Sequence, residues 1–169
     1  MGRPLALIGG LLALAGAILG LFMSFGGWWI LEMRIFNAES TAYFNAFWGS
    51  YDSISDETVY IAEEMVKAAS GILVVLGGIL CLFQKKSLAA IGGILILAGI
   101  GLWALNFADM SKDFFDFINL SGEVGFLEMF RGSREGPLGL IKVSWTIGPG
   151  LIMTLAGGIL GLIGSAGRD

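Results

Sequence analysis

Four long apolar segments, separated by polar and aromatic stretches, dominate the hydrophobic pattern of the chain. Spans are predicted at about residues 5–25, 58–83, 88–107 and 145–165. A bilayer core about 30 Å thick needs about 20 apolar residues in a helix to cross it. The pattern therefore predicts an all-α membrane protein, a four-helix transmembrane bundle formed by one domain over residues 1–169.

The second span is expected to begin ahead of its apolar core. Residues 57–67 run into that core without Gly or Pro, and Glu63 and Glu64 precede Lys67 at a spacing that supports a helix. We therefore predict a helix that starts near residue 58 and projects from the membrane by about two turns. Its polar turn is read as a solvated helix end, with an ion site in a pathway as the alternative.

Basic residues near the span ends predict the orientation, because cytoplasmic segments are enriched in Lys and Arg. Arg3 precedes the first span, and Arg168 follows the fourth. Lys85 and Lys86 occupy the short link between the second and third spans. The chain is therefore predicted to be a multi-pass protein of the plasma membrane, with both termini in the cytoplasm.

Two longer segments, residues 26–57 and 108–144, are predicted to form loops on the outer side. Both are rich in aromatic residues, unlike flexible linkers. We expect two structured loops that pack on each other as an outer cap, with dipping of the aromatics into the headgroup layer as the alternative. Whether the cap is sheet or helix stays open. Three tryptophans occupy the positions of an outer aromatic belt: Trp28, Trp29 and Trp145.

A weak internal repeat relates the two halves of the chain. Residues 8–16 match residues 91–99 at an offset of 83, and the same offset aligns residues 47–50 with residues 130–133. The halves, about 5–83 and 88–165, would each contain a span, an outer loop and a second span. Such halves share one orientation and form a parallel repeat.

Small residues in the spans are expected to allow close helix packing, because helices in lipid associate by close contact rather than by the hydrophobic effect. The packing positions are Gly16, Gly20, Gly93, Gly157 and Gly161. We favour packing within the bundle, with oligomerisation through the same faces as the alternative. Pro149 is expected to kink the fourth span or to mark a break in it.

Composition excludes several classes of function. The chain is 56% hydrophobic and only 14% charged, and it contains no histidine and one cysteine. Histidine catalysis, histidine-ligated metals and intrachain disulfides are therefore excluded, and we expect no enzyme, no cofactor and no metal site. A net charge of −4 without a basic cluster argues against nucleic acid as a partner. Cys81 is read as a small buried hydrophobe, with palmitoylation as the alternative.

Local sequence features, taken together with the predicted topology, resemble those of a known family. Trp28 and Trp29 close the first span, and Phe47-Trp48-Gly49 follows about twenty residues later. Asp113-Phe114-Phe115 follows the third span, and residues 157–164 of the fourth are rich in glycine. With four spans and two outer loops, this layout resembles the claudin and peripheral-myelin-protein superfamily. The paired cysteines and the Gly-Leu-Trp motif of that family are absent, and the second loop is long.

The resemblance implies a small twisted β-sheet in the first outer loop, with the second loop beside it, and a role in adhesion, barrier formation or chaperoning. We therefore expect a non-enzymatic membrane scaffold whose cap binds copies of itself or another membrane protein. The candidate binding residues are the loop aromatics Phe47, Trp48, Phe114 and Phe115. One alternative is an accessory structural subunit of a larger respiratory or transport complex. A multimeric pore is a second alternative.

Overall fold

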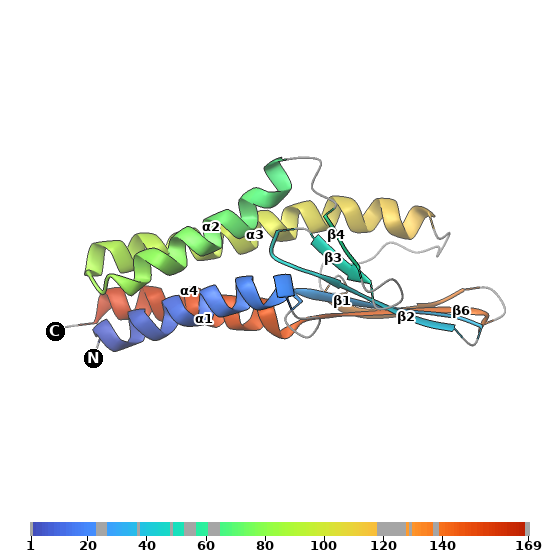
Figure 1. The fold of residues 1–169 in the computed structure, drawn as a ribbon, viewed down its shortest axis with the longest axis horizontal. Coiled ribbons are helices and arrows are strands. Elements are labelled where there is room, and N and C mark those ends of the chain that lie inside the picture. The colour runs from blue at the N-terminus through green and yellow to red at the C-terminus, as the bar shows by residue number, and fades with distance from the viewer. Residues whose placement is uncertain are drawn as a thin grey trace.

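The computed structural model describes residues 2–22, 27–36, 38–47, 49–52, 57–60, 65–117, 128, 130–136 and 139–167. Within these residues the chain is mostly helical. A bundle of four helices carries a six-stranded antiparallel sheet at one end, and the two chain termini lie at the other end (Figure 1).

Each half of the chain contains two helices with strands between them. The helices are α1 (Gly2–Phe22), α2 (Met65–Leu82), α3 (Lys86–Phe117) and α4 (Pro149–Ala166). Between α1 and α2 lie the strands β1 (Trp29–Ile35), β2 (Ala38–Phe44), β3 (Gly49–Asp52) and β4 (Glu57–Tyr60). Between α3 and α4 lie β5 (Arg131–Glu135) and β6 (Ile141–Ile147).

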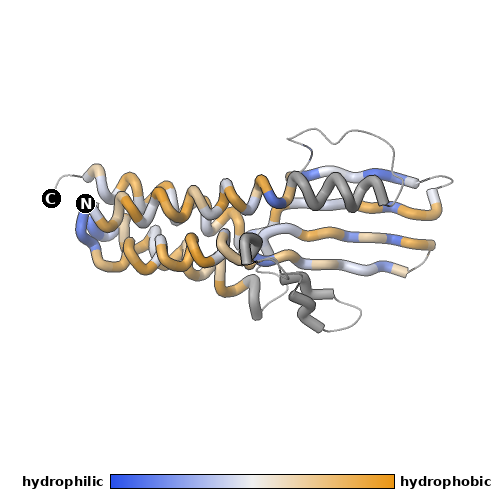
Figure 2. Tube along the Cα trace, turned by 90° about the horizontal axis from the view of Figure 1, so that it is seen from above, coloured by the Kyte–Doolittle hydropathy of each residue, from blue (hydrophilic) through white to orange (hydrophobic). Residues whose placement is uncertain are grey.

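The apolar helices indicate a membrane protein. In α1, α3 and α4, the segments Gly2–Leu19, Lys86–Phe107 and Pro149–Ala166 are long and apolar enough to cross a bilayer, whereas the apolar part of α2, Ala68–Leu82, is shorter. Large aliphatic side chains point outward from all four helices, among them Leu11, Ile72, Ile94 and Ile159. Contact of this apolar surface with water would be unfavourable, whereas lipid chains can cover it. Polar residues gather at the end with the termini, where Lys85 and Lys86 lie (Figure 2).

Glycine seams hold the helices together. The ideal Cβ position of Gly9 lies 2.6 Å from the carbonyl oxygen of Gly157, a distance that real Cβ atoms do not show. Facing pairs recur every seven residues between antiparallel α1 and α4: Gly2 with Gly164, Gly9 with Gly157, and Gly16 with Gly150. A second seam joins α2 to α3, where Gly77 faces Gly92 and Gly99 faces the backbone of Ser70. The backbones therefore approach too closely to admit a side chain.

The two seams are related by the offset seen in the sequence. Gly9 and Gly16 of α1 face α4, and their equivalents at an offset of 83, Gly92 and Gly99 of α3, face α2. Helices α2 and α4 are both 18 residues long. Exchange of the two halves would thus map one seam onto the other, as expected from a duplicated unit. Duplication itself stays a prediction.

The sheet answers a question that the sequence left open, because the cap contains β-strands while the bundle is helical. Its strand order is β4-β3-β2-β1-β6-β5, with antiparallel pairing between all neighbours. Four strands come from the first outer segment and two from the second, and β1 pairs with β6 along seven residues. The resemblance implied a sheet in the first segment only, whereas the two segments form one sheet.

The helix boundaries differ from the predicted spans in three places. Helix α2 begins at Met65 rather than near residue 58, because Glu57–Tyr60 pairs with β3 as a strand. Glu63 and Glu64 lie outside the described residues. Helix α3 continues beyond Phe107 to Phe117. Residues 145–147 belong to β6, and α4 begins at Pro149, so the proline marks a break in the predicted span and not a kink. A residue without an N–H group suits the first helical position.

Candidate interaction surface

A buried aromatic cluster joins the sheet to the bundle. Trp28 is fully buried and donates its indole N–H to the carbonyl of Gly16 in α1 at 3.0 Å. Its ring meets Trp103 of α3 edge-on at 5.5 Å, and Trp103 stacks on Phe107 at 5.2 Å. Trp29 of β1 contacts Phe107 edge-on at 4.5 Å. Trp28 and Trp29 thereby fix the start of β1 to α1 and α3.

The loop after β2 strengthens this junction through hydrogen bonds to the bundle. Trp103 donates its indole N–H to the carbonyl of Asn45 at 3.3 Å, and Ser70 of α2 donates its hydroxyl to the carbonyl of Ala46 at 2.8 Å. Both acceptors are buried, so each bond satisfies a carbonyl that water cannot reach. These bonds anchor the base of the sheet to the bundle.

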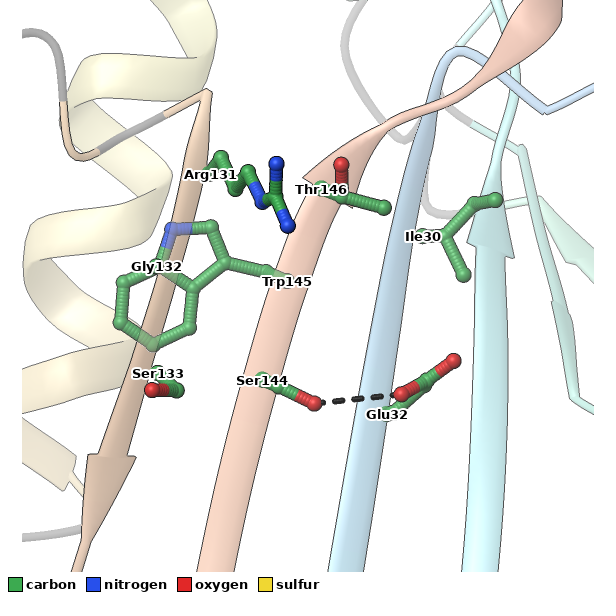
Figure 3. Close-up of a pocket in the computed structure, with 8 residues that line it drawn as sticks. All are labelled: Ile30, Glu32, Arg131, Gly132, Ser133, Ser144, Trp145 and Thr146. Carbon is green, nitrogen blue, oxygen red and sulfur yellow. Dashed lines mark hydrogen bonds between the residues drawn. The ribbon is translucent and has the colours of Figure 1, made fainter.

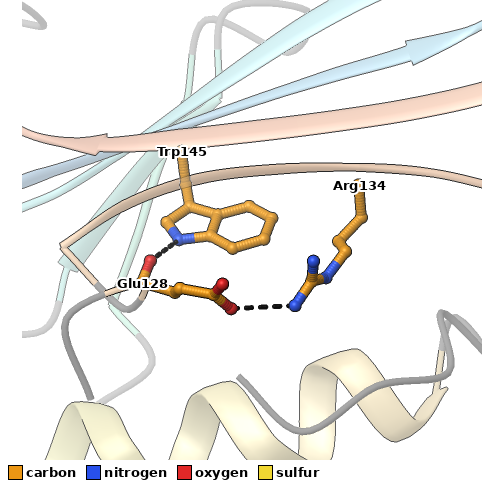
Figure 4. A network of polar contacts seen from close by, with 3 residues as sticks. All are labelled: Glu128, Arg134 and Trp145. Atoms are coloured by element: carbon orange, nitrogen blue, oxygen red, sulfur yellow. Dashed lines mark hydrogen bonds and ion pairs between the residues drawn. The ribbon is translucent and has the colours of Figure 1, made fainter. Parts of the chain in front are cut away.

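The burial of these tryptophans corrects the predicted aromatic belt. Trp28, Trp29 and Trp145 are exposed by 3% of their surface at most, so their rings face the protein interior and not lipid. Trp145 lies over Gly132 of β5 and donates its indole N–H to the carbonyl of Glu128 (Figure 4). Arg134 of β5 points to the same face and pairs with the Glu128 carboxylate at 2.8 Å. This face of the sheet is directed toward α3 (Figure 4).

The opposite face of the sheet, called the polar face here, consists of alternate residues of four strands. Its members are Ile30, Glu32, Arg34, Glu39, Thr41, Tyr43, Arg131, Ser133, Glu135, Lys142, Ser144 and Thr146. Ser144 donates its hydroxyl to Glu32 at 3.2 Å across the strands (Figure 3). A row of charges nearer the tip is paired as Lys142 with Glu135 and Arg34 with Glu39.

An open hollow of about 480 Å³ lies on the sheet near its β5 side, lined by Ile30, Glu32, Arg131, Ser133, Ser144 and neighbouring residues (Figure 3). It is lined by one carboxylate, one guanidinium and hydroxyls. In the described part of the chain, no group of three His, Cys, Asp or Glu residues could hold a metal ion. We assign no ligand to the hollow.

The end of the sheet farthest from the bundle carries an apolar tip, which we define as Ile35, Phe36 and Leu140. All three are exposed, Phe36 by 67%. The N–H of Phe36 donates to the carbonyl of Leu140 at 2.9 Å, so the turn after β1 and the residue before β6 are held together. The tip thus presents a contiguous apolar surface beyond the polar face.

The backbone of Phe36 is in the left-handed region, with φ at 54°. Ile35 pairs with Ala38, so two residues connect β1 to β2. A left-handed first residue in such a hairpin strongly favours Asn, Asp or Gly, because other residues have a steric conflict that costs about 1–2 kcal/mol. A bulky, exposed aromatic at this place opposes stability, and such local conflicts concentrate at functional positions.

The four predicted binding residues do not form one surface in the described part of the chain. The Phe47 ring lies against Gly71 of α2 and is partly buried, so its described contacts are internal. Trp48 lies outside the described residues. Phe114 and Phe115 belong to the last turns of α3, and their side chains lie outside the described part. The apolar tip was missed, because no periodicity marks an exposed turn residue.

The predicted packing glycines lie at helix contacts within the chain. Gly16 faces Gly150 and Thr154, and Gly157 faces Gly9. Gly93 lies against Leu162, and Gly161 lies beside the Cys81 sulfur. Gly20 belongs to α1, and its surroundings are outside the described part. Cys81 is fully buried, packed between helices as a small apolar residue.

Comparison with known proteins adds no family to this picture: no protein-family model and no curated protein matches the sequence. The function therefore has to be inferred from the residues and their geometry.

Proposed function

We propose that this protein is a four-span scaffold of the plasma membrane whose outer sheet mediates adhesion between copies of itself, without enzymatic activity or cofactor. All four helices cross the bilayer, both termini are cytoplasmic, and the sheet lies outside. The basic residues at the end with the termini support this orientation.

The observation that carries the proposal is the apolar tip. Phe36 combines 67% exposure with a left-handed backbone, at the outermost point of a sheet that is fixed to the membrane bundle. Aromatic anchors on rigid supports give affinity at a low entropic cost. An exposed Phe at this position costs stability in the isolated protein. Burial of its ring against a partner would explain why it is there.

The claudin-like resemblance is part of the proposal. Its implied outer sheet agrees in position with four of the six strands, β1 to β4, which lie between α1 and α2. Disulfides cannot pin this sheet, because the chain has a single cysteine. The Trp28–Trp103 cluster and the seven-residue pairing of β1 with β6 supply the rigidity instead. Adhesion and barrier formation are the activities that fit a rigid, non-catalytic cap.

Replacement of Phe36 by Asn is expected to stabilise the protein and weaken adhesion at the same time. Asn tolerates the left-handed backbone, so the free energy of unfolding should rise by about 1 kcal/mol. The ring is lost, so clustering of proteoliposomes that carry the variant should fall at least tenfold. Turbidity and dynamic light scattering report clustering, and thermal unfolding in detergent reports stability.

The matched control is Phe83→Asn. Phe83 is similarly exposed, by 61%, but follows α2 at the opposite end of the bundle. Clustering by this variant should equal that of the wild type. Unchanged clustering by Phe36→Asn would contradict the role of the tip. If wild-type vesicles stay dispersed, adhesion fails as the function, and an accessory role in a larger membrane complex becomes the better account.

A further inference from the structure

The edge strand β5 carries an inference that rests on the proposed adhesion and specifies its geometry. We propose that β5 of one copy pairs antiparallel with β5 of a second copy in a facing membrane, with Ser133 on the two-fold axis. Among the described residues, β5 has β6 as its one strand partner, and it forms a border of the sheet.

Two hydrogen bonds show which backbone groups of β5 face outward. Ile147 donates its N–H to the carbonyl of Phe130, and Gly136 donates its N–H to the carbonyl of Ile141. Pairing groups alternate along an antiparallel strand, so the even-numbered residues of β5 bond to β6. The N–H and C=O groups of Arg131, Ser133 and Glu135 therefore point to the open edge, where a further strand can add.

The outward residues are complementary to themselves. A two-fold axis at Ser133 places Arg131 opposite Glu135 of the second copy, and Glu135 opposite its Arg131. All three residues belong to the set with outward backbone groups, so each opposed pair can exchange two hydrogen bonds. Opposite charges in directly opposed positions favour this register, and like charges would oppose it. Arg131 is exposed and has no carboxylate partner in the described part of the chain.

The direction of the strands decides where the second copy resides. Strands β1, β2 and β6 continue the long axis of the bundle, which defines the membrane normal (Figures 1 and 2). Antiparallel pairing of a strand with its own copy requires a two-fold axis perpendicular to the strand. That axis inverts the second bundle, so its membrane must face the first.

The register also predicts how close the membranes come. Ser133 is in the row of Ser144 and Glu32, and Glu32 is the fourth of seven residues in β1. The two sheets therefore overlap along their full height, and each apolar tip reaches the base of the other sheet, at the opposite bilayer. Seven residues at about 3.3 Å each give a gap of about 25 Å, whereas tips that met end to end would give about 50 Å.

Charge exchange between proteoliposome populations tests the pairing. Vesicles with Arg131→Glu alone and vesicles with Glu135→Arg alone should each cluster at least tenfold less than the wild type, since like charges then oppose each other. A mixture of the two populations should recover clustering, because one population then carries carboxylates at both positions and the other carries guanidinium groups at both. The double variant Arg131→Glu/Glu135→Arg should cluster by itself, with a gap of about 25 Å in cryo-electron micrographs.

The control for net charge is Arg34→Glu, a change of the same size on β1, away from the β5 edge, which should leave clustering intact. Normal clustering by the single edge variants, no recovery in the mixture, or an equal loss with Arg34→Glu would overturn β5 pairing while adhesion stood. The same holds for a gap near 50 Å. Dispersed wild-type vesicles would overturn adhesion and β5 pairing together.

Discussion

Gly157→Leu in α4 is expected to abolish the native bundle. The ideal Cβ at this position lies 2.5 Å from the carbonyl oxygen of Gly9 and 2.9 Å from the Cβ of Ala13, in a seam of two backbones. Neither backbone can yield without moving a whole helix, so the cost should exceed about 3 kcal/mol. Thermal unfolding of the purified protein in detergent, followed by circular dichroism and size-exclusion profile, measures the effect.

Gly101→Leu is the matched control. Gly101 lies in α3, also within the apolar helix, but nothing lies within 4 Å of its ideal Cβ. This variant should fold as the wild type does, or more stably, because glycine is a poor helix former. Equal melting of the Gly157 and Gly101 variants would mean that the seam is not the packing contact described.

Trp103→Ala should have the second large effect, about 3–5 kcal/mol of lost stability. Trp103 is 1% exposed, contacts both Trp28 and Phe107, and satisfies the buried carbonyl of Asn45. Its loss removes the centre of the cluster that fixes the sheet to the bundle. Amide exchange in β1 should accelerate more than exchange at the far end of the α1–α4 seam, around Gly2 and Gly164, which is remote from the space that the indole leaves.

Trp103→Phe separates packing from hydrogen bonding. A Phe ring keeps the contact with Phe107 but leaves the Asn45 carbonyl without its donor, so a loss of about 1–3 kcal/mol is expected. If Trp103→Ala left exchange in β1 unchanged, the aromatic cluster would not be what holds the sheet, and a rigid cap would lose its physical basis.

The apolar helices are the part of this fold that the sequence predicts well. Residues 88–105 are continuously apolar, and α3 covers them all. Such a run has few alternatives, because lipid demands that every backbone group be paired within the helix. The end of α3 was harder to predict, since residues 108–117 contain no Gly or Pro and continue the helix beyond the apolar run.

The sheet could not be read from local pattern. Thr58, Val59 and Tyr60 suit a strand and follow an acidic stretch, yet they also suit the extension of a helix. Pairing with β3 decides between the two, and β3 is fixed only through β2 and β1. The contact between β1 and β6 joins residues more than a hundred positions apart, which no sequence window contains.

The proposed surface lies at a different place from the predicted binding residues. Exposed aromatics of the outer segments were expected to bind, and Phe36 is such a residue, but its importance depends on the register that makes it a left-handed turn residue. Phe47 is also an aromatic residue of the first outer segment, but its ring packs on Gly71. Trp28 and Trp145 were misread for the same reason, because a tryptophan at a span end can face either lipid or the protein interior.

Sided labelling in intact cells tests most directly whether the bundle is in the bilayer with the sheet outside. Ser133→Cys of the sheet and Ser87→Cys of the link end are both exposed, and the native Cys81 is buried, so the wild type gives the background. An impermeant maleimide should label Ser133→Cys on intact cells and Ser87→Cys only after permeabilisation. Labelling of both variants on intact cells, or of Ser87→Cys alone, would contradict the account.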